Sequence, residues 1–405
     1  MAYDEPGRTA SGESTPNVPA AVLENVFDDP AHGEPGRDRV AVHLVWETAL
    51  LVGLAVLTFL LWRADADALR GAGLRTLLVD VVALGLLALA AGLSLRTGAV
   101  NLAVGPVAVA AALHFAEQGD RGAPAALVPL LVAAAVGGLA VALVVVVLHV
   151  PGWAASLAAA AGVVVWIERR TAPVTVQGEY DPRRTAFYLF AGFAAAAALG
   201  GIFGAIRAVR RLVGRFRPVS DPARRRGAVA AVVTALALVG STVLAALAGV
   251  LIAANGSGPV VPGAGLDWTV LAVGVALLAG TSAYGRRGGI FGTLFTVGLV
   301  VVFLAWLAAE DRSVSRWAVG AVLLGAGLVV TRLVEAYGRP RRCGVEAGER
   351  APAGDGTIST GWSLHRPGPA QNWPPALPAQ STATPPDPWE APRWDAGPDR
   401  WDDDR

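Results

Sequence analysis

The sequence contains no lysine, so all 33 residues counted as Lys or Arg are Arg. The phosphate-binding loop G-x-x-x-x-G-K-[ST] needs a lysine that reaches the phosphates of a bound nucleotide. The chain therefore cannot hydrolyse ATP with this loop, and any energy from a nucleotide has to come from a partner subunit. We expect no cofactor in this chain, because that partner would bind the ATP.

Cysteine is nearly absent as well. The single Cys343 excludes an internal disulfide and cannot form a metal cluster by itself. The five histidines never stand at the spacing of metal ligands, and no H-E-x-x-H or C-x-x-C pair occurs. We therefore expect no metal site and no catalytic residues, and the chain is predicted not to be an enzyme.

Charged residues are scarce and apolar residues dominate. Of the 405 residues, 54% are hydrophobic and 16% are charged, which is far more apolar than the globular average. A helix needs about 17 to 25 apolar residues to cross a hydrocarbon core about 30 Å thick. The sequence therefore predicts an all-α polytopic membrane protein with about ten transmembrane helices. The predicted spans are 41–62, 77–95, 102–116, 125–148, 153–167, 186–206, 228–253, 268–284, 290–309 and 317–334.

Two of these spans, 102–116 and 153–167, are short. Short segments tilt, break or enter only part of the bilayer, where they pack against protein rather than lipid. A Gly/Arg hinge at 285–289 separates the eighth span from the ninth. Its glycines supply the permissive backbone that a tight turn needs.

The two ends of the chain are polar. Residues 1–40 and the Pro- and Trp-rich residues 336–405 are predicted to be disordered tails around a transmembrane domain at 41–335. Basic residues near span ends favour the cytoplasmic side. With the N-terminus inside, ten alternating spans place the Arg clusters at 207–226, 286–287 and 339–342 on that side. We therefore predict a multi-pass plasma-membrane protein with both termini in the cytoplasm, although the four Arg residues of loop 168–184 would lie outside.

Five ionisable residues lie in the spans or at their ends. Because a charge in the bilayer is costly, such residues suggest function by default. Each of these lies close enough to a span end to reach headgroups or water, so we expect a structural role. The five are Glu47, Asp80, Arg96, His114 and His149.

Asn101 differs from these residues because it lies in RTGAVNLAVGP, between two apolar runs. Gly98, Gly105 and Pro106 loosen the backbone on both sides of it. Backbone groups freed in this way can, together with an amide, line a polar path through a helix bundle. Judged by periodicity alone, the motif is weak.

Four stretches, in the same order along the chain, resemble segments of the membrane permease subunits of ABC importers for ribose, other simple sugars and related small solutes. RTGAVNLAVGP from Arg96 is similar to TGGIDLSVGS, and VPGWAASLA from Val150 to VPPFIVTLG. LAALAGVLIAANGSGPVVPGAG from Leu244 is similar to the LAGI-type span and its outer loop. LAGTSAYGRRGGIFGTL from Leu278 resembles LGGTSLAGGRGSIVGTL and is the most specific of the four. The likeness covers roughly residues 41–335.

The resemblance implies a permease that pairs with a second copy or a related subunit in the lipid bilayer. A cytoplasmic ABC ATPase would power it, an extracytoplasmic solute-binding protein facing residues 258–267 would supply it, and no nucleic acid is expected. The implied solute path or hinge comprises Gly98, Asn101, Gly105, Trp153, Ser156, Thr281 and Ser282. The implied ATPase-coupling element comprises Ser220, Asp221, Pro222, Arg224, Arg225 and Arg226.

The coupling loop departs from the family pattern. Family members carry a string like GGNEEAARLSGI, whereas this chain has PVSDPARRRGAVA, in which an Arg triplet replaces the acidic pair. The alternative is a diverged, non-transporting membrane scaffold that recruits cytoplasmic partners through residues 344–405. The sequence leaves open which solute is carried and whether the dimer is homo- or heteromeric.

Overall fold

The computed structural model describes residues 40–206, 228–282 and 289–338. In these ranges the chain forms ten α-helices, and the only β-type pairing is an isolated bridge between Val174 and Val260. The helices are α2 (Val40–Ala64), α3 (Gly71–Arg96), α4 (Val104–Gln118), α5 (Ala123–Val147), α6 (Gly152–Glu168), α7 (Ala186–Ala205), α9 (Ala228–Asn255), α10 (Leu266–Leu278), α11 (Gly292–Ala309) and α12 (Arg316–Gly338). The 3-10 turns η1 (Asp67–Leu69), η2 (Gly119–Arg121) and η3 (Pro182–Thr185) join some of them.

Seven of the described helices are long and apolar enough to cross a membrane, which supports a transmembrane protein. Each predicted span lies on one helix, but α4, α6 and α10 have only 15, 17 and 13 residues. The shortness of α4 and α6 agrees with the sequence. The prediction for α10 was wrong, because this helix ends at Leu278 and Gly280 takes a φ of +92°, which ends right-handed helix.

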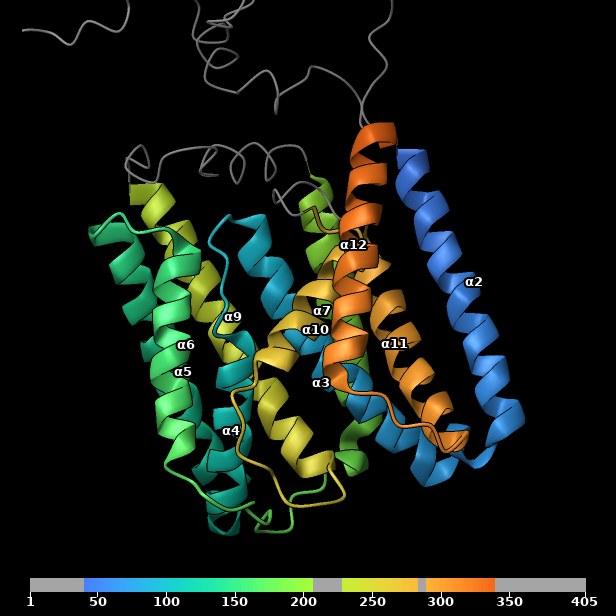
Figure 1. Cartoon of the computed structure of the whole chain (residues 1–405), viewed down its shortest axis with the longest axis horizontal. Helices are drawn as coiled ribbons and strands as arrows, with labels where there is room; N and C mark the ends of the chain where they lie inside the picture. Colours follow the sequence, from blue (N-terminus) through green and yellow to red (C-terminus); the bar gives the residue numbers. More distant parts are fainter. Residues whose placement is uncertain (1–39, 207–227, 283–288, 339–405) are drawn as a thin grey trace, which may run out of the picture. The chain divides into compact units, whose positions relative to one another are not determined.

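Helices α3 and α9 form the centre of the bundle (Figure 1). In an apolar stretch of 18 residues, 61% of the α3 residues and 56% of the α9 residues are buried, compared with 17% for α2 at the periphery. The two run antiparallel, since Asn255 at the end of α9 donates to the Thr76 carbonyl (3.0 Å) and to Asp80 Oδ1 (2.6 Å) in the first half of α3. Alanine and glycine make up nearly half of the residues on their buried faces, which lets neighbouring helices approach closely.

The helices around this pair repeat one arrangement in opposite orientations. Helices α4 and α5 both follow α3 and pack on α9, whereas α10 and α11 follow α9 and pack on α3. Among the helices that follow α3, the short helix α4 also packs on α6. Among those that follow α9, the short helix α10 also packs on α12. Helices α3–α6 and α9–α12 thus form two similar four-helix groups of inverted direction, an arrangement common among transporters.

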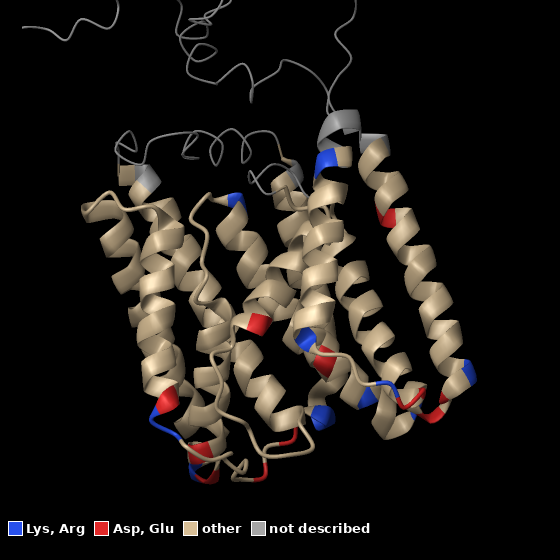
Figure 2. Cartoon of the chain, in the orientation of Figure 1, with Lys and Arg blue, Asp and Glu red and all other residues tan. Residues whose placement is uncertain are grey.

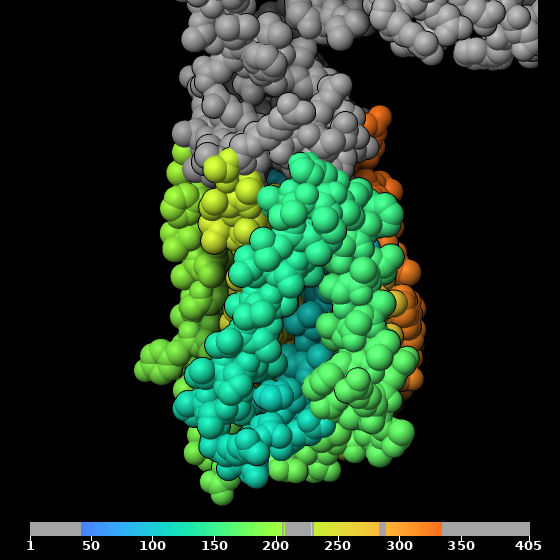
Figure 3. Space-filling model, turned by 90° about the vertical axis from the view of Figure 1, so that its left-hand side faces the viewer, coloured from blue at the N-terminus to red at the C-terminus, as the bar shows by residue number. Residues whose placement is uncertain are grey.

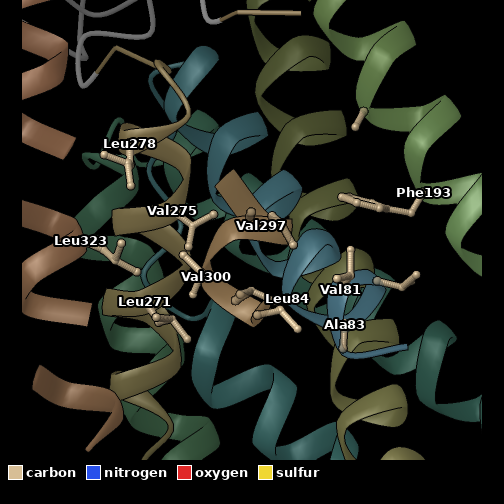
Figure 4. Packing of buried hydrophobic residues seen from close by; sticks show 14 of the residues in the cluster. Val81, Ala83, Leu84, Phe193, Leu271, Val275, Leu278, Val297, Val300 and Leu323 are labelled. Atoms are coloured by element: carbon tan, nitrogen blue, oxygen red, sulfur yellow. The ribbon is translucent and has the colours of Figure 1, made fainter. Parts of the chain in front are cut away.

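Apolar side chains fill the space within and between the groups (Figure 4). Leu271 and Val275 of α10 meet Leu323 of α12, and Val300 of α11 meets Leu84 of α3. The α10–α12 crossing is especially close, because a Cβ on Gly274 would lie 2.8 Å from the Leu324 nitrogen. Close backbone approach replaces the hydrophobic effect as the source of contact energy between helices in lipid.

We name the two ends of the bundle after residues that lie there. At the Arg96 end α3 and α7 finish and α9 and α11 begin. At the Asn255 end α3 and α7 begin and α9 and α11 finish. Most described charged residues gather at the Asn255 end (Figure 2). The predicted Arg clusters and residues 285–288 of the predicted hinge lie outside the described residues. The helix ends that flank them are all at the Arg96 end (Figure 1).

The loop between α6 and η3 folds over the Asn255 end. Val174 pairs with Val260 through two backbone hydrogen bonds, and the Gln177 N–H donates to the Ala116 carbonyl (3.0 Å). Arg170 stacks on the Trp166 ring and forms a two-pronged ion pair with Glu117, in which Nη2 lies 2.9 Å from Oε2. The loop is thereby tied to the ends of α4 and α6.

We predict that Glu117 makes stability depend on pH. The hydrogen bond from Arg170 holds the pKa of Glu117, which lies beyond the predicted third span, below its ordinary value of 4.5. A depressed pKa stabilises the folded state above the unfolded-state pKa, and this contribution is lost as pH falls through the folded-state pKa. The unfolding temperature of the wild type should therefore fall more on acidification below pH 4.5 than that of Glu117→Gln. Glu168→Gln, an exposed carboxylate nearby, is the control and should behave like the wild type.

Candidate functional site

The chain leaves the helical path between α3 and α4, at residues 97–103. Gly98, a predicted hinge or path residue, takes a φ of +67° and ends α3, a conformation that glycine adopts without strain. The linker then leads from the Arg96 end to the start of α4 inside the bundle (Figure 1). Its backbone groups lack the regular helical partners, so side chains from other helices have to pair with them.

Asn101 lies in this linker and is 3% exposed. Its Oδ1 accepts a hydrogen bond from the Ala103 N–H (3.0 Å). Its amide nitrogen donates to Ser241 Oγ (3.1 Å) and Thr242 Oγ1 (3.3 Å) on α9. The amide therefore binds the linker to the central helix, a stabilising role that comes in addition to the predicted role in a polar path.

Ser156 and Thr269 support the linker from two further helices. Ser156, fully buried on α6, accepts from the Leu102 N–H (3.0 Å) and lies 3.0 Å from the Val100 carbonyl oxygen. Thr269, on the first turn of α10, accepts from the Gly105 N–H (3.0 Å) and donates to the Leu102 carbonyl (3.2 Å). Side chains of α6 and α10 thus pair with backbone groups of the linker, and α9 holds the Asn101 side chain.

The first turns of α4 and α10 meet at Gly105 and Gly265. A Cβ on Gly105 would overlap the Gly265 carbonyl oxygen, and a Cβ on Gly265 would lie 2.7 Å from the Gly105 oxygen. From this point α4 runs to the Asn255 end and α10 runs to the Arg96 end (Figure 1). We call the meeting of Leu102, Gly105, Gly265 and Thr269 the half-helix junction.

The remaining predicted path residues lie apart from the junction. Trp153 is 55% exposed on the outer face of α6, whereas Thr281 and Ser282 are each 2% exposed beyond the end of α10. Thr331 of α12 lies within hydrogen-bonding distance of the Thr281 carbonyl, at 3.5 Å. The structure therefore places Asn101, Ser156 and Gly105 at the linker and the junction, and Gly98 at the start of the linker, but Trp153, Thr281 and Ser282 are elsewhere. The predicted coupling residues Ser220, Asp221, Pro222, Arg224, Arg225 and Arg226 lie outside the described residues.

Two ionisable residues bind other helices instead of reaching headgroups. Glu47 is 6% exposed, and its Oε1 accepts from the Phe291 N–H (3.0 Å) at the start of α11. The prediction that Glu47 reaches headgroups or water was therefore wrong, whereas its contact with α11 is structural. An acidic side chain is favourable there because the helix N-terminus is partly positive. Arg96 is partly buried and donates to the Gly200 carbonyl of α7 (3.1 Å). Glu47 thus joins α2 to α11, and Arg96 joins α3 to α7, in each case helices that are distant in sequence.

Two openings lie near the junction. The surfaces of α5 and α6 part around a hollow in which α4 is visible (Figure 3). At the Asn255 end there is a cavity of about 280 Å³ among α4, the end of α9, the loop 256–265 and the first turns of α10 and α12. Its lining residues are Ala108, Val109, Ala112, Ile252, Ala253, Gly256, Gly258, Pro259, Val260, Val261, Trp268 and Arg316.

Sequence reasoning missed Ser241, Thr242, Thr269, Trp268 and Arg316. Hydroxyl residues within apolar spans were the available signal, since lipid disfavours them unless they pair with protein. Arg316 lies at the start of the tenth predicted span, where a headgroup contact explains any Arg. Only the fold shows that this Arg faces a cavity.

The described side chains at this site act through hydrogen bonds and packing. Within the described residues no group of three His, Cys, Asp or Glu side chains could hold a metal ion. Comparison with protein-family models, curated proteins and solved structures gave no match. The family resemblance of the four stretches therefore stays a prediction, and the functional argument depends on the geometry of the junction and cavity.

We predict that the Thr269 hydroxyl stabilises the junction. Thr269→Val keeps the shape of the side chain but leaves the Gly105 N–H and the Leu102 carbonyl unpaired, which should cost about 1–3 kcal/mol. Thr269→Ser retains the hydroxyl and serves as the matched control. Thermal unfolding of the purified protein in detergent measures the difference. Equal unfolding temperatures for the two variants would show that the hydroxyl does not hold the junction.

Proposed function

We propose that this chain is the membrane permease subunit of an ABC importer, and that it forms the path for a sugar or similar small solute. A separate ATPase subunit supplies the energy, consistent with a sequence that lacks the lysine of the phosphate-binding loop. The proposal draws on the half-helix junction and on the resemblance of the four stretches.

The junction is the observation that carries the proposal. Helices α4 and α10 are about 22 Å and 20 Å long, too short to cross a hydrocarbon core of about 30 Å. They begin at one point inside the bundle and leave it in opposite directions, each preceded by irregular chain. Discontinuous helices whose N-termini meet between inverted groups are typical of proteins that carry solutes. A purely structural bundle has no need to break two central helices.

The inverted groups supply the movement. Helices α3–α6 and α9–α12 are held together through the α3–α9 pair and by the contacts of α4 with α9 and of α10 with α3. Rocking one group against the other shifts α4 relative to α10 and opens the junction first to one end and then to the other. ATP binding in the partner subunit drives this rocking through the chain between α7 and α9.

The alternative of a non-transporting scaffold depends on residues 344–405 and on the altered coupling loop. Both lie outside the described residues. No feature of the described helices favours the scaffold, so it stays a prediction.

Solute uptake tests the proposal. Cells that lack this chain should lose ATP-dependent uptake of at least one solute from a panel of labelled pentoses, hexoses and small carboxylates, and the wild-type chain should restore it. Gly105→Ala should restore little uptake, because the added Cβ overlaps Gly265 and forces α4 away from α10.

The matched control is Gly137→Ala on α5, where an added Cβ meets no atom within 4 Å. It should restore uptake fully, and both variants should reach the membrane in equal amounts. If uptake of every solute in the panel is unchanged without the chain, the permease assignment is wrong. Equal uptake by the two variants would remove the junction from the mechanism.

A further inference from the structure

The cavity at the Asn255 end has the chemistry of a small-molecule site. Its volume of about 280 Å³ lies just below the range of about 300–1,000 Å³ that is usual for such sites, so it suits only a compact ligand. Carbon-rich side chains such as Ala108, Val109 and Ile252 form most of its wall. Among its lining residues Arg316 has the only ionisable side chain, and Trp268 has the only aromatic one.

Arg316 is held in a defined position at this cavity. Its Nε donates to Asp267 Oδ2 (2.7 Å), and its guanidinium carbon lies 4.6 Å from the centre of the Trp268 ring. The side chain is nevertheless 54% exposed. Because the bond to Asp267 uses Nε, the end of the guanidinium still offers one N–H from each terminal nitrogen. These two N–H groups are parallel and can bind a carboxylate with two hydrogen bonds.

The lining discriminates between classes of solute. A sugar presents hydroxyl groups on all sides, and each one loses water on entering the cavity and needs a polar partner. The lining side chains offer only the Arg316 guanidinium and the Trp268 indole N–H as such partners. A molecule with a hydrocarbon body and one carboxylate matches the wall, which is apolar apart from a single cationic group.

One further feature favours a carboxylate over other polar groups. The first turns of α10 and α12 both reach the cavity, through Trp268 and Arg316, and the start of a helix is partly positive. Asp267 offsets part of the Arg316 charge, so the site selects through paired hydrogen bonds rather than through net charge.

We propose that this cavity binds a small monocarboxylate with an apolar body, with Arg316 binding the carboxylate and Trp268 packing against the hydrocarbon. The inference rests on the proposed permease function and, among small solutes, favours a monocarboxylate over a sugar. Trp268 directly precedes Thr269, which pairs with Gly105 and Leu102 at the half-helix junction. A ligand pressed against Trp268 therefore contacts the same turn of α10 that moves in transport.

Binding to the purified full-length chain in lipid nanodiscs tests the proposal. The probes are 3-methylbutanoate, its neutral amide 3-methylbutanamide and ribose, measured by calorimetry. The carboxylate should bind about tenfold or more tightly than the amide, because a charge-assisted pair to Arg is much stronger than a neutral hydrogen bond. Ribose should bind more weakly than the carboxylate.

Matched variants separate the site from general surface charge. Arg316→Gln should weaken carboxylate binding about tenfold or more, whereas Arg312→Gln, an exposed Arg in the preceding loop, should leave it unchanged. Asp267→Asn should strengthen it, because the competing negative charge is gone while Arg316 remains. A purely structural ion pair would give the opposite result, since loss of either partner would then weaken binding.

Several outcomes would overturn the proposal. They are equal affinity for the carboxylate and the amide, equal loss in the Arg316 and Arg312 variants, and tighter binding of ribose than of the carboxylate. If ribose uptake depends on the chain but is unchanged by Arg316→Gln, and the carboxylate does not bind, this inference is refuted and the permease function remains supported. Carboxylate binding without any chain-dependent uptake would support the site and refute transport.

Discussion

Backbone N–H and C=O groups at the depth of a lipid bilayer must pair with protein, and this requirement is hardest to meet at the break between α3 and α4. The linker 97–103 is not helical, so its backbone groups lack the regular pairing of a helix. Asn101, Ser156 and Thr269 supply the missing partners from the linker itself, α6 and α10. Since Asn101 is in turn held by α9, the break is stable only when four separate segments are assembled.

This dependence explains why small residues are concentrated at the crossings. Because Asn101 of the linker binds α9, the helix that follows the linker, α4, lies directly on α9. At this contact a Cβ on Gly249 would overlap the Ala108 carbonyl oxygen. For α10 to present Thr269 it has to cross close to α4 at Gly265 and close to α12 at Gly274. Larger side chains would hold the helices apart by more than a hydrogen bond can span, so the polar pairing and the glycines require each other.

Polar side chains elsewhere in the bundle act in the same way. Trp46 donates its indole N–H to the Leu278 carbonyl (2.8 Å), which is one of the orphan acceptors at the end of α10. Glu47, the next residue, accepts from the Phe291 N–H at the start of α11. Helix α2 thus caps both sides of the gap between α10 and α11, where the sequence predicted a hinge. An ionisable group inside an apolar helix marks a contact here, and the partner is more than 200 positions away along the chain.

Composition and local pattern were sufficient for the coarse architecture. Apolar run length located helices at all ten predicted spans and identified α4 and α6 as short, because length and hydropathy are properties of a continuous segment. The break around Asn101 was also readable, since Gly98, Gly105 and Pro106 disfavour an uninterrupted helix whatever surrounds them. Which spans cross the membrane fully depended on local helix ends, and the left-handed Gly280 shortened α10 unexpectedly.

The partners of these residues were decided by tertiary structure alone. Nothing near Asn101 in the sequence indicates Ser241, and nothing near Arg316 indicates Trp268 or the cavity beside it. Such pairs join helices that meet only after the two inverted groups pack on the α3–α9 pair. The sequence determined where the chain is helical and where it breaks, because those are local preferences of the backbone. The fold decided which side chains meet at the break, because close contact depends on how distant helices cross.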